Sequence, residues 1–458
     1  MDYAEFVAGK TRRASGCGIV APELNPALFD WQREAVTWAL GMGRAALFED
    51  CGLGKAIQSL EWARCVPGDV LALCPLAVAS QWRAEAVKFN VGCDVGISRD
   101  GTKAGKITIT NYEQAHKFNV SDYNAVVLDE SGCLKNYVGK LKRWLLEAFK
   151  DTPFRLCCTA TPAPNDHLEL GNHSEFLGVM SSHQMIARWF INDSGEAGTY
   201  RLKGHAVADF WDWVSSWARC IGKPSDLGTY SDDGYVLPKL ERKLHVVGVE
   251  LVTGRQEGEL FRIPGTSATK IHKEKRLTAP VRAAKVRAII DSDPDEQWLI
   301  WCDTDYESDA LKAELPEAID VRGSHTVALK EERLMAFATG DIQTLITKPK
   351  IAGFDLNWQL CARVAFVGPT FSFEQWYQAV RRCWRFGQKR CVEVHMVMAQ
   401  TEESVYQVLM RKSREHESMQ RHMFAAARRA QRGAALPDGY NPTHMAPVPP
   451  FMESIWTS

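Results

Sequence analysis

Short apolar runs alternate with longer amphipathic stretches from residue 25 to about 170, and again from 281 to about 400. Continuous apolar runs are typical of strands buried on both faces of a sheet, and the stretches between them indicate helices. The runs predict strands at 45–48, 70–74, 107–110, 124–128 and 154–159, and then at 297–302, 343–347, 363–367 and 392–398. This alternation predicts an α/β fold with two parallel sheets, each covered by helices on both faces.

Three segments depart from this alternation, and they set the expected domain boundaries. Residues 1–24 form a lead-in, 25–170 a first lobe, 171–280 an insertion or brace with a linker, and 281–425 a second lobe. The brace is rich in aromatic residues, among them Trp189, Trp211, Trp213 and Trp217. Tryptophan is mostly buried in proteins, which favours packing against the first lobe over base stacking. The tail, 426–458, has a proline-rich end and is expected to be disordered.

Composition limits the class of protein more than its function. The chain has 458 residues, of which 45% are hydrophobic and 24% are charged, as in an ordinary globular protein of two or more domains. No apolar run reaches membrane-spanning length, and thirteen cysteines are scattered without metal-site spacing. A reduced, cytoplasmic protein is the simple interpretation. The net charge of −1 does not indicate nucleic-acid binding, although the basic stretch 371–433 could be a DNA-facing flank or a solvated helix.

A glycine-rich loop follows the first predicted strand and precedes a helical pattern. It reads Cys51-Gly52-Leu53-Gly54-Lys55-Ala56. In such loops the glycines bring backbone N–H groups close to phosphates, the helix N-terminus adds positive potential, and the lysine neutralises the outer phosphates. The Ser or Thr whose hydroxyl would hold Mg²⁺ is replaced by Ala56. On its own, this short signature is more often an ordinary turn.

Two further strands end in polar residues, and a distant segment carries two arginines. The strand at 124–128 runs into Asp129 and Glu130, which could hold Mg²⁺ and deprotonate an attacking water. The strand at 154–159 runs into a Thr-Ala-Thr-Pro segment. Arg382 and Arg385 lie three apart on a predicted helix that ends at Gly387, a spacing that suits a phosphate.

The order of these segments resembles superfamily 2 helicase-type motors, and most closely the Swi/Snf-type DNA translocases. The segments that carry the resemblance are 29–36, 74–76 with 81–82, 109–113, the Asp-Glu box 129–136 with its Leu-Lys-Asn ending, 159–162, 353–357 and 378–388. The match covers roughly 25–170 and 280–400. The compact length is similar to that of phage- or prophage-encoded members.

The resemblance implies two RecA-like lobes that hydrolyse ATP with Mg²⁺ in the cleft between them. It implies catalytic roles for Lys55, Asp129, Glu130, Arg382 and Arg385, with Asp129 on the metal ion and the two arginines acting on the γ-phosphate. Residues implied in ATP binding are Gln32, Gly52, Leu53, Gly54, Lys55, Ala56 and Gln378, and residues implied in coupling to DNA are Thr159, Thr161, Gly353 and Asn357. Asp355, in place of the usual glycine, and Gly132, in place of a larger residue, depart from the family pattern.

The expected function is an ATP-dependent motor, with double-stranded DNA as the favoured partner and no membrane. Three alternatives stay open on the sequence. The chain could separate strands of DNA or RNA, it could be the motor subunit of a restriction or nuclease system, or, because of Ala56, it could be a weakly or non-hydrolysing DNA-binding module regulated by ATP. Protein partners and the direction of movement do not follow from the sequence.

Overall fold

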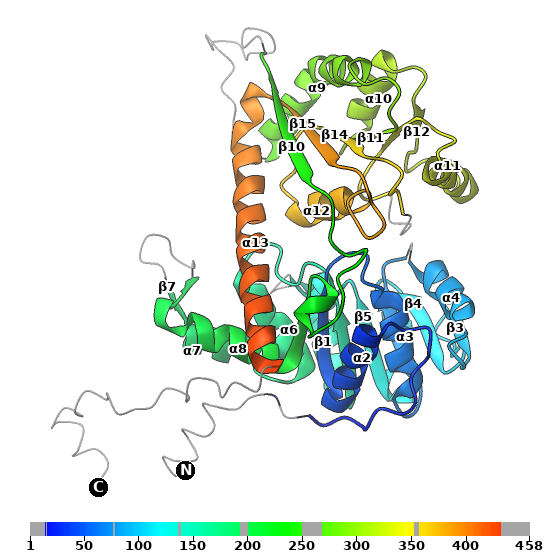
Figure 1. Cartoon of the computed structure of the whole chain (residues 1–458), viewed down its shortest axis with the longest axis vertical. Coiled ribbons are helices and arrows are strands. Elements are labelled where there is room, and N and C mark those ends of the chain that lie inside the picture. Colours follow the sequence, from blue (N-terminus) through cyan, green and yellow to red (C-terminus); the bar gives the residue numbers. More distant parts are fainter. Residues whose placement is uncertain are drawn as a thin grey trace, which may run out of the picture.

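The computed structural model describes residues 14, 16–76, 78–135, 139–192, 200–249, 268–351 and 357–431. They form two parallel sheets with helices on both faces, joined by one long helix that runs along both (Figure 1). The predicted α/β class with two RecA-like lobes is therefore confirmed. Gly353 and Asp355 lie outside the described residues, as does the part of the predicted 426–458 tail that runs from residue 432 to residue 458.

The first sheet has seven strands in the order β3-β4-β2-β5-β6-β1-β9, and every pairing in it is parallel. The strands are β1 (Arg44–Glu49), β2 (Val70–Cys74), β3 (Val95–Ile97), β4 (Ile107–Asn111), β5 (Ala125–Asp129), β6 (Phe154–Cys158) and β9 (Ala218–Ile221). Alternate residues along each strand face opposite sides, so each strand contributes to two cores.

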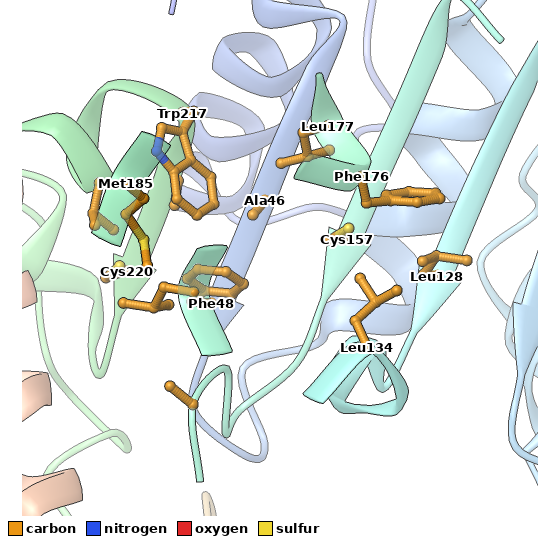
Figure 2. Packing of buried hydrophobic residues seen from close by; sticks show 14 of the residues in the cluster. Ala46, Phe48, Leu128, Leu134, Cys157, Phe176, Leu177, Met185, Trp217 and Cys220 are labelled. Carbon is orange, nitrogen blue, oxygen red and sulfur yellow. The ribbon is translucent and has the colours of Figure 1, made fainter. Parts of the chain in front are cut away.

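One face of this sheet is covered by α2 (Asp30–Met42), α3 (Lys55–Cys65) and α4 (Ala79–Lys88). The other face is covered by α5 (Lys140–Ala148), α6 (Leu170–Leu177), α7 (Ser182–Trp189) and α8 (Val207–Trp217). Figure 2 shows this second core, where Phe48, Leu128 and Cys157 from three strands meet Phe176 of α6 and Trp217 of α8. The hairpin of β7 (Phe190–Asn192) and β8 (Tyr200–Leu202) follows α7.

The aromatic segment packs against the first lobe, as expected. Its four tryptophans are at most 4% exposed, so they are not available to stack on bases in this conformation. Strand β9, which comes from the same segment, pairs with β1 and becomes an edge of the first sheet. The segment that we interpret as an insertion or brace thus supplies part of the first lobe's own core.

The second sheet has six parallel strands in the order β10-β15-β14-β11-β13-β12. They are β10 (Leu240–Val247), β11 (Trp298–Trp301), β12 (Ile319–Asp320), β13 (Thr344–Thr347), β14 (Arg363–Val367) and β15 (Val392–Ala399). The helices α9 (Ala268–Asp291) and α10 (Asp305–Glu314) cover one face, and α11 (Val327–Thr339) and α12 (Phe373–Arg381) cover the other.

Helix α13 (Glu403–Gln431) spans both lobes (Figure 1). Leu409 near its start lies in the second lobe's core, whereas Met419, Met423 and Ala426 lie in the first lobe's core. The sequence predicts a disordered tail from residue 426 onward. That expectation is wrong for 426–431, because Ala426 and Ala427 are buried and Arg428 and Arg429 pair with Asp226 and Asp212.

Within the described residues, no helix is both long enough and apolar enough to cross a membrane.

Candidate active site

The glycine-rich loop that precedes Lys55, which we call the phosphate-type loop, connects β1 to α3. Its backbone requires glycine at two positions. Gly52 and Gly54 have φ angles of +86° and +80°, which L-amino acids with a side chain rarely adopt. A Cβ atom at Gly54 would also lie 2.6 Å from Nε2 of Gln32. The glycines that the sequence singles out therefore have a structural reason at this loop, which begins a helix as a phosphate cradle requires.

Lys55 is the first residue of α3, and its ammonium group lies against the loop itself. Its Nζ donates to the backbone oxygens of Glu49 and Asp50, at 3.0 and 3.1 Å. Burial lowers the pKa of Lys55, but the nearby groups of Cys51, Glu130 and Glu49 outweigh it, so the pKa lies above its ordinary value. The side chain is thus a permanent cation at the point where phosphate charge would be neutralised.

The carboxylates Asp129 and Glu130 lie at the end of β5. Asp129 Oδ2 accepts a hydrogen bond from Trp82 Nε1 at 3.0 Å, and Glu130 Oε2 accepts one from the Thr159 hydroxyl at 3.1 Å. Glu130 has a φ of +53°, one of two non-glycine residues with positive φ in the described chain. Backbone strain of this kind is concentrated at functional sites.

A cavity of about 420 Å³ brings the predicted groups of both lobes together. Lys55 and Glu130 from the first lobe and Arg382 and Arg385 from the second line it, although more than 250 residues separate the two sets. The other predicted residues in its lining are Gly52, Gly54, Ala56, Asp129, Gln378 and Asn357. A loop that carries a lysine, two carboxylates and two arginines thus meet across one cleft, an arrangement that suits a triphosphate.

Two predicted nucleotide-binding residues, Gln32 and Leu53, do not line the cavity. Gln32 is 4% exposed and donates from Nε2 to the Leu53 backbone oxygen at 2.9 Å, while its Oε1 accepts from the Phe29 backbone N–H at 3.0 Å. Neither Gln32 nor Leu53 lines the cavity in the described structure. In this conformation Gln32 supports the loop, and its role in reading adenine stays a prediction.

The two threonines assigned to nucleic-acid coupling are fully buried. The Thr159 hydroxyl donates a hydrogen bond to Glu130, and its oxygen also accepts the backbone N–H of Thr161 at 3.1 Å. The hydroxyl of Thr161 is buried with no hydrogen-bond partner among the described residues. A coupling role for this segment would therefore act through Glu130 and not through direct contact with a nucleic-acid backbone.

The expected helix through Arg382 and Arg385 is shorter than predicted. Helix α12 ends at Arg381, and both arginines lie in the turns that follow. The carbonyl of Arg382 accepts from the Trp358 backbone N–H at 3.1 Å, and that of Cys383 accepts from Gln388 Nε2 at 3.3 Å. These carbonyls take partners outside the helix, and the N–H groups of Arg382 and Cys383 already bond three residues back, as at a helix C-terminus.

The sequence assigned no role in the site to several residues that the structure places there. Phe386 lines the cavity and would lie 3.4 Å from a Cβ at Gly52, and Trp82 holds Asp129. Asp50, which precedes the loop, accepts the Tyr377 hydroxyl at 2.7 Å and forms an ion pair with Arg381. The sequence does show Arg381 directly before Arg382, but its partner Asp50 is 331 positions away, so the ion pair could not be predicted from the sequence.

Glu49, beneath the loop, gives a pH-dependent prediction. Its carboxyl is fully buried, and burial raises its pKa from 4.5 to about 7, although Lys55 and the Gln58 hydrogen bond oppose this. The folded state therefore binds this proton more tightly than the unfolded state does. The stability that protonated Glu49 contributes is present below pH 4.5 and is lost as the pH rises through about 7. We expect Glu49→Gln to raise the free energy of unfolding at pH 8 by up to ~3 kcal/mol, with no gain at pH 4.5.

Denaturant unfolding of both proteins at the two pH values measures this effect. Glu147→Gln, at a side chain that is 76% exposed, is the matched control and should show the same pH profile as the parent. A Glu49→Gln profile parallel to that of the parent would contradict the assignment.

Two parallel α/β lobes around a phosphate-type loop, with cations from the second lobe facing that loop, define the class of two-lobed P-loop nucleotide-binding proteins. Within that class, residues 31–203 match the family model of the SNF2-related domain. This part of the chain is therefore similar to SNF2-related domains, and the predicted resemblance to the Swi/Snf branch is confirmed.

Individual relatives share only part of their length with this chain. It is 28% identical over 221 residues to Helicase domino of Drosophila melanogaster, which covers 41% of this chain and 7% of the relative. It is 31% identical over 140 residues to the SWI/SNF-related matrix-associated actin-dependent regulator of chromatin subfamily A-like protein 1 homolog of Caenorhabditis elegans, which covers 27% and 20%. The chain therefore spans a fifth or less of each of these relatives.

A solved structure, the Sulfolobus solfataricus SWI2/SNF2 ATPase core in complex with dsDNA, is 17% identical with a TM-score of 0.39, covering 91% of this chain and 97% of that one.

Proposed function

We propose that this chain is an ATP-dependent nucleic-acid motor, and that it translocates on double-stranded DNA. The observation that carries the proposal is the cavity between the lobes, where Lys55 and Glu130 face Arg382 and Arg385. A site divided in this way is complete only when the lobes are closed, so turnover would be linked to their movement. The SNF2-related domain and the names of its relatives, a helicase and a chromatin regulator, support nucleic acid as the partner.

In this proposal each side chain has a limited task. Lys55 binds the outer phosphates, and Glu130 orients a water molecule and accepts its proton. Arg382 and Arg385 stabilise the charge that develops on the transferred phosphoryl group. The Thr159 hydroxyl donates to Glu130 and accepts the Thr161 backbone N–H, so a coupling role of this segment would act through Glu130.

The residues present fit a magnesium ion bound mainly through the nucleotide. Among the described residues no group of three or more His, Cys, Asp or Glu could hold a metal ion by itself. Mg²⁺ commonly takes one or two carboxylates together with substrate phosphates and waters, and Asp129 lines the cavity in a suitable place. When bound, Mg²⁺ would neutralise phosphate charge. Asp129 is the residue that would hold it.

The test of the proposed function is ATP turnover with no nucleic acid, with single-stranded DNA, with double-stranded DNA and with RNA. We expect double-stranded DNA to give the largest stimulation, with no strand displacement. Displacement of a labelled strand would instead identify a helicase. Activity that needs an added nuclease subunit would support the restriction-type alternative. Nucleotide-dependent DNA binding with no turnover would support the non-hydrolysing module. A cytoplasmic location stays a prediction.

Ala56 gives a prediction about magnesium. It lines the cavity directly after Lys55, where a Thr hydroxyl would supply one ligand. A water must take that place, so we expect slow turnover with a high magnesium requirement. Ala56→Thr should raise turnover or lower the Mg²⁺ concentration needed for half-maximal rate. Magnesium titrations of DNA-stimulated turnover measure both quantities.

Small size is the competing explanation for alanine at this position. Ala56→Ser adds a hydroxyl with less bulk and should move the titration in the same direction as Ala56→Thr. Identical titrations for all three equally stable proteins would mean that the hydroxyl has no role here.

A further inference from the structure

Helix α12 presents three polar side chains to the first lobe. Glu374, Tyr377 and Arg381 are spaced at i, i+3 and i+7, which places them along one face of the helix. Two of them reach Asp50, directly before the phosphate-type loop, and the third reaches Lys135 near the end of the Asp-Glu box. We call Glu374, Tyr377 and Arg381 the docking face.

The contact with Asp50 is buried and specific. Asp50 Oδ1 accepts the Tyr377 hydroxyl at 2.7 Å and also the backbone N–H of Cys51 at 2.7 Å, while Oδ2 pairs with Arg381. The side chains of Arg381 and Asp50 are 4% and 15% exposed. Breaking a pair this well buried leaves a charge without compensation, unlike an exposed surface pair.

Around this contact, charge and packing favour the docked arrangement. Burial raises the pKa of the Asp50 carboxyl, but Arg381 and Tyr377 outweigh it, and the pKa lies below its ordinary value. Arg381 also lies 4.8 Å from the ring of Trp384, and the ring of His416 on α13 lies 5.0 Å from that of Tyr377. Residues of the second lobe therefore pack against Arg381 and Tyr377 and hold them in place.

The second contact lies beside a residue that has no side chain. Glu374 pairs with Lys135 in the 3₁₀ segment Ser131–Lys135. A Cβ atom at Gly132 would lie 2.8 Å from Oε1 of Glu374. Gly132, one of the departures from the family pattern, thus leaves the space that this carboxylate of the second lobe occupies.

These contacts fix the geometry of the cleft. They hold α12 at both walls of the cavity, the loop after β1 and the segment after β5. The residues of α12 and the turns after it, Gln378, Arg382 and Arg385, line the same cavity. A displacement of α12 would move both arginines away from the loop, and errors of about 1 Å can cost ~10²-fold in rate.

We propose that Glu374, Tyr377 and Arg381 are positioning residues that dock the second lobe onto Lys135 and Asp50, and so hold Arg382 and Arg385 at the phosphate loop. This inference rests on the proposed function, because it assigns the docking face a role in ATP turnover. It predicts that loss of docking lowers kcat, since the arginines act in the closed cleft, while the first lobe still binds ATP.

The experiment is a charge exchange in the full-length protein. Lys135→Glu and Glu374→Lys should each lower kcat of DNA-stimulated turnover by ~10-fold to 100-fold, with KM for ATP changed by less than about threefold. The double variant, with the charges exchanged, should recover most of the loss. Arg390→Glu is the matched control, because Arg390 pairs with Glu296 inside the second lobe and should leave kcat unchanged. Exchange of Asp50 and Arg381 is the second, more buried test.

A second measurement does not depend on catalysis. Hydrogen exchange of the ligand-free chain should be faster in segments 49–54 and 131–135 of each single variant, and near the parent rate in the double variant. Recovery of kcat and protection in the double variant supports docking. Single variants with parent kcat and parent protection, or a double variant no better than either single one, would overturn it. A parent that lacks ATP turnover but shows the protection changes would overturn the proposed function and leave docking intact.

Discussion

Glu130→Gln is expected to bind ATP with close to the parent affinity and to lose turnover by roughly 10²-fold to 10⁴-fold, the range for loss of a general base. Glutamine keeps the size of the side chain and an oxygen that can accept the Thr159 hydroxyl, which lies 3.1 Å from Glu130 Oε2. It cannot accept the proton of an attacking water. Binding and hydrolysis should therefore separate in this variant, as measured by nucleotide titration and by steady-state turnover with double-stranded DNA.

Two controls make the separation interpretable. Lys55→Ala removes the cation at the loop and should weaken nucleotide binding, the opposite pattern. Glu113→Gln changes an exposed carboxylate outside the cavity and should match the parent in both measurements. Hydrolysis by Glu130→Gln at the parent rate would contradict the assignment of the base.

The strands were predictable where they are buried on both faces. Strands β1, β2, β4, β5, β6, β11, β13, β14 and β15 lie within a residue or so of their predicted bounds. Most of them read as apolar runs, whereas β4 and the start of β15 alternate apolar with polar residues. Strand β10 was missed because it is an edge strand whose sequence, Leu-Glu-Arg-Lys-Leu-His-Val-Val, has exposed and half-buried positions. The short strands β3 and β12 were missed for a similar reason, because all of their positions are half-buried.

Site residues were predictable where local order carries the chemistry. Lys55, Asp129 and Glu130 follow predicted strands, and the carboxyl ends of parallel strands meet at one edge of a sheet. The docking face was not predictable in this way. Tyr377 and Asp50 are 327 positions apart, and the partner of a helical face becomes visible only once the two lobes are placed against each other.

The basic stretch at 371–433 shows the same limit. Its excess of positive charge was open to two interpretations, a DNA-facing flank or a solvated helix. Several of its residues instead pair with the first lobe: Arg381 with Asp50, Arg428 with Asp226, and Arg429 with Asp212. Lys412 reaches Asn165 of the first lobe at 2.8 Å. Part of this charge therefore contacts the first lobe, which net charge along a sequence cannot reveal.

Arg382→Ala and Arg385→Ala are each expected to lower DNA-stimulated turnover by ~10³-fold or more, the range for loss of an arginine finger. Both residues line the cavity with Lys55, and both follow the helix that docks on Asp50, so their loss removes charge without removing the docking contacts. Arg→Lys at either position should restore little, since an ammonium group cannot reproduce a planar, two-pronged guanidinium contact. Arg390 pairs with Glu296 away from the cavity, and an exposed ion pair of this kind contributes little to stability. Arg390→Ala should therefore keep turnover within about twofold of the parent. Parent-like turnover in both cavity variants, with circular dichroism showing folded protein, would mean that the second lobe does not complete the site.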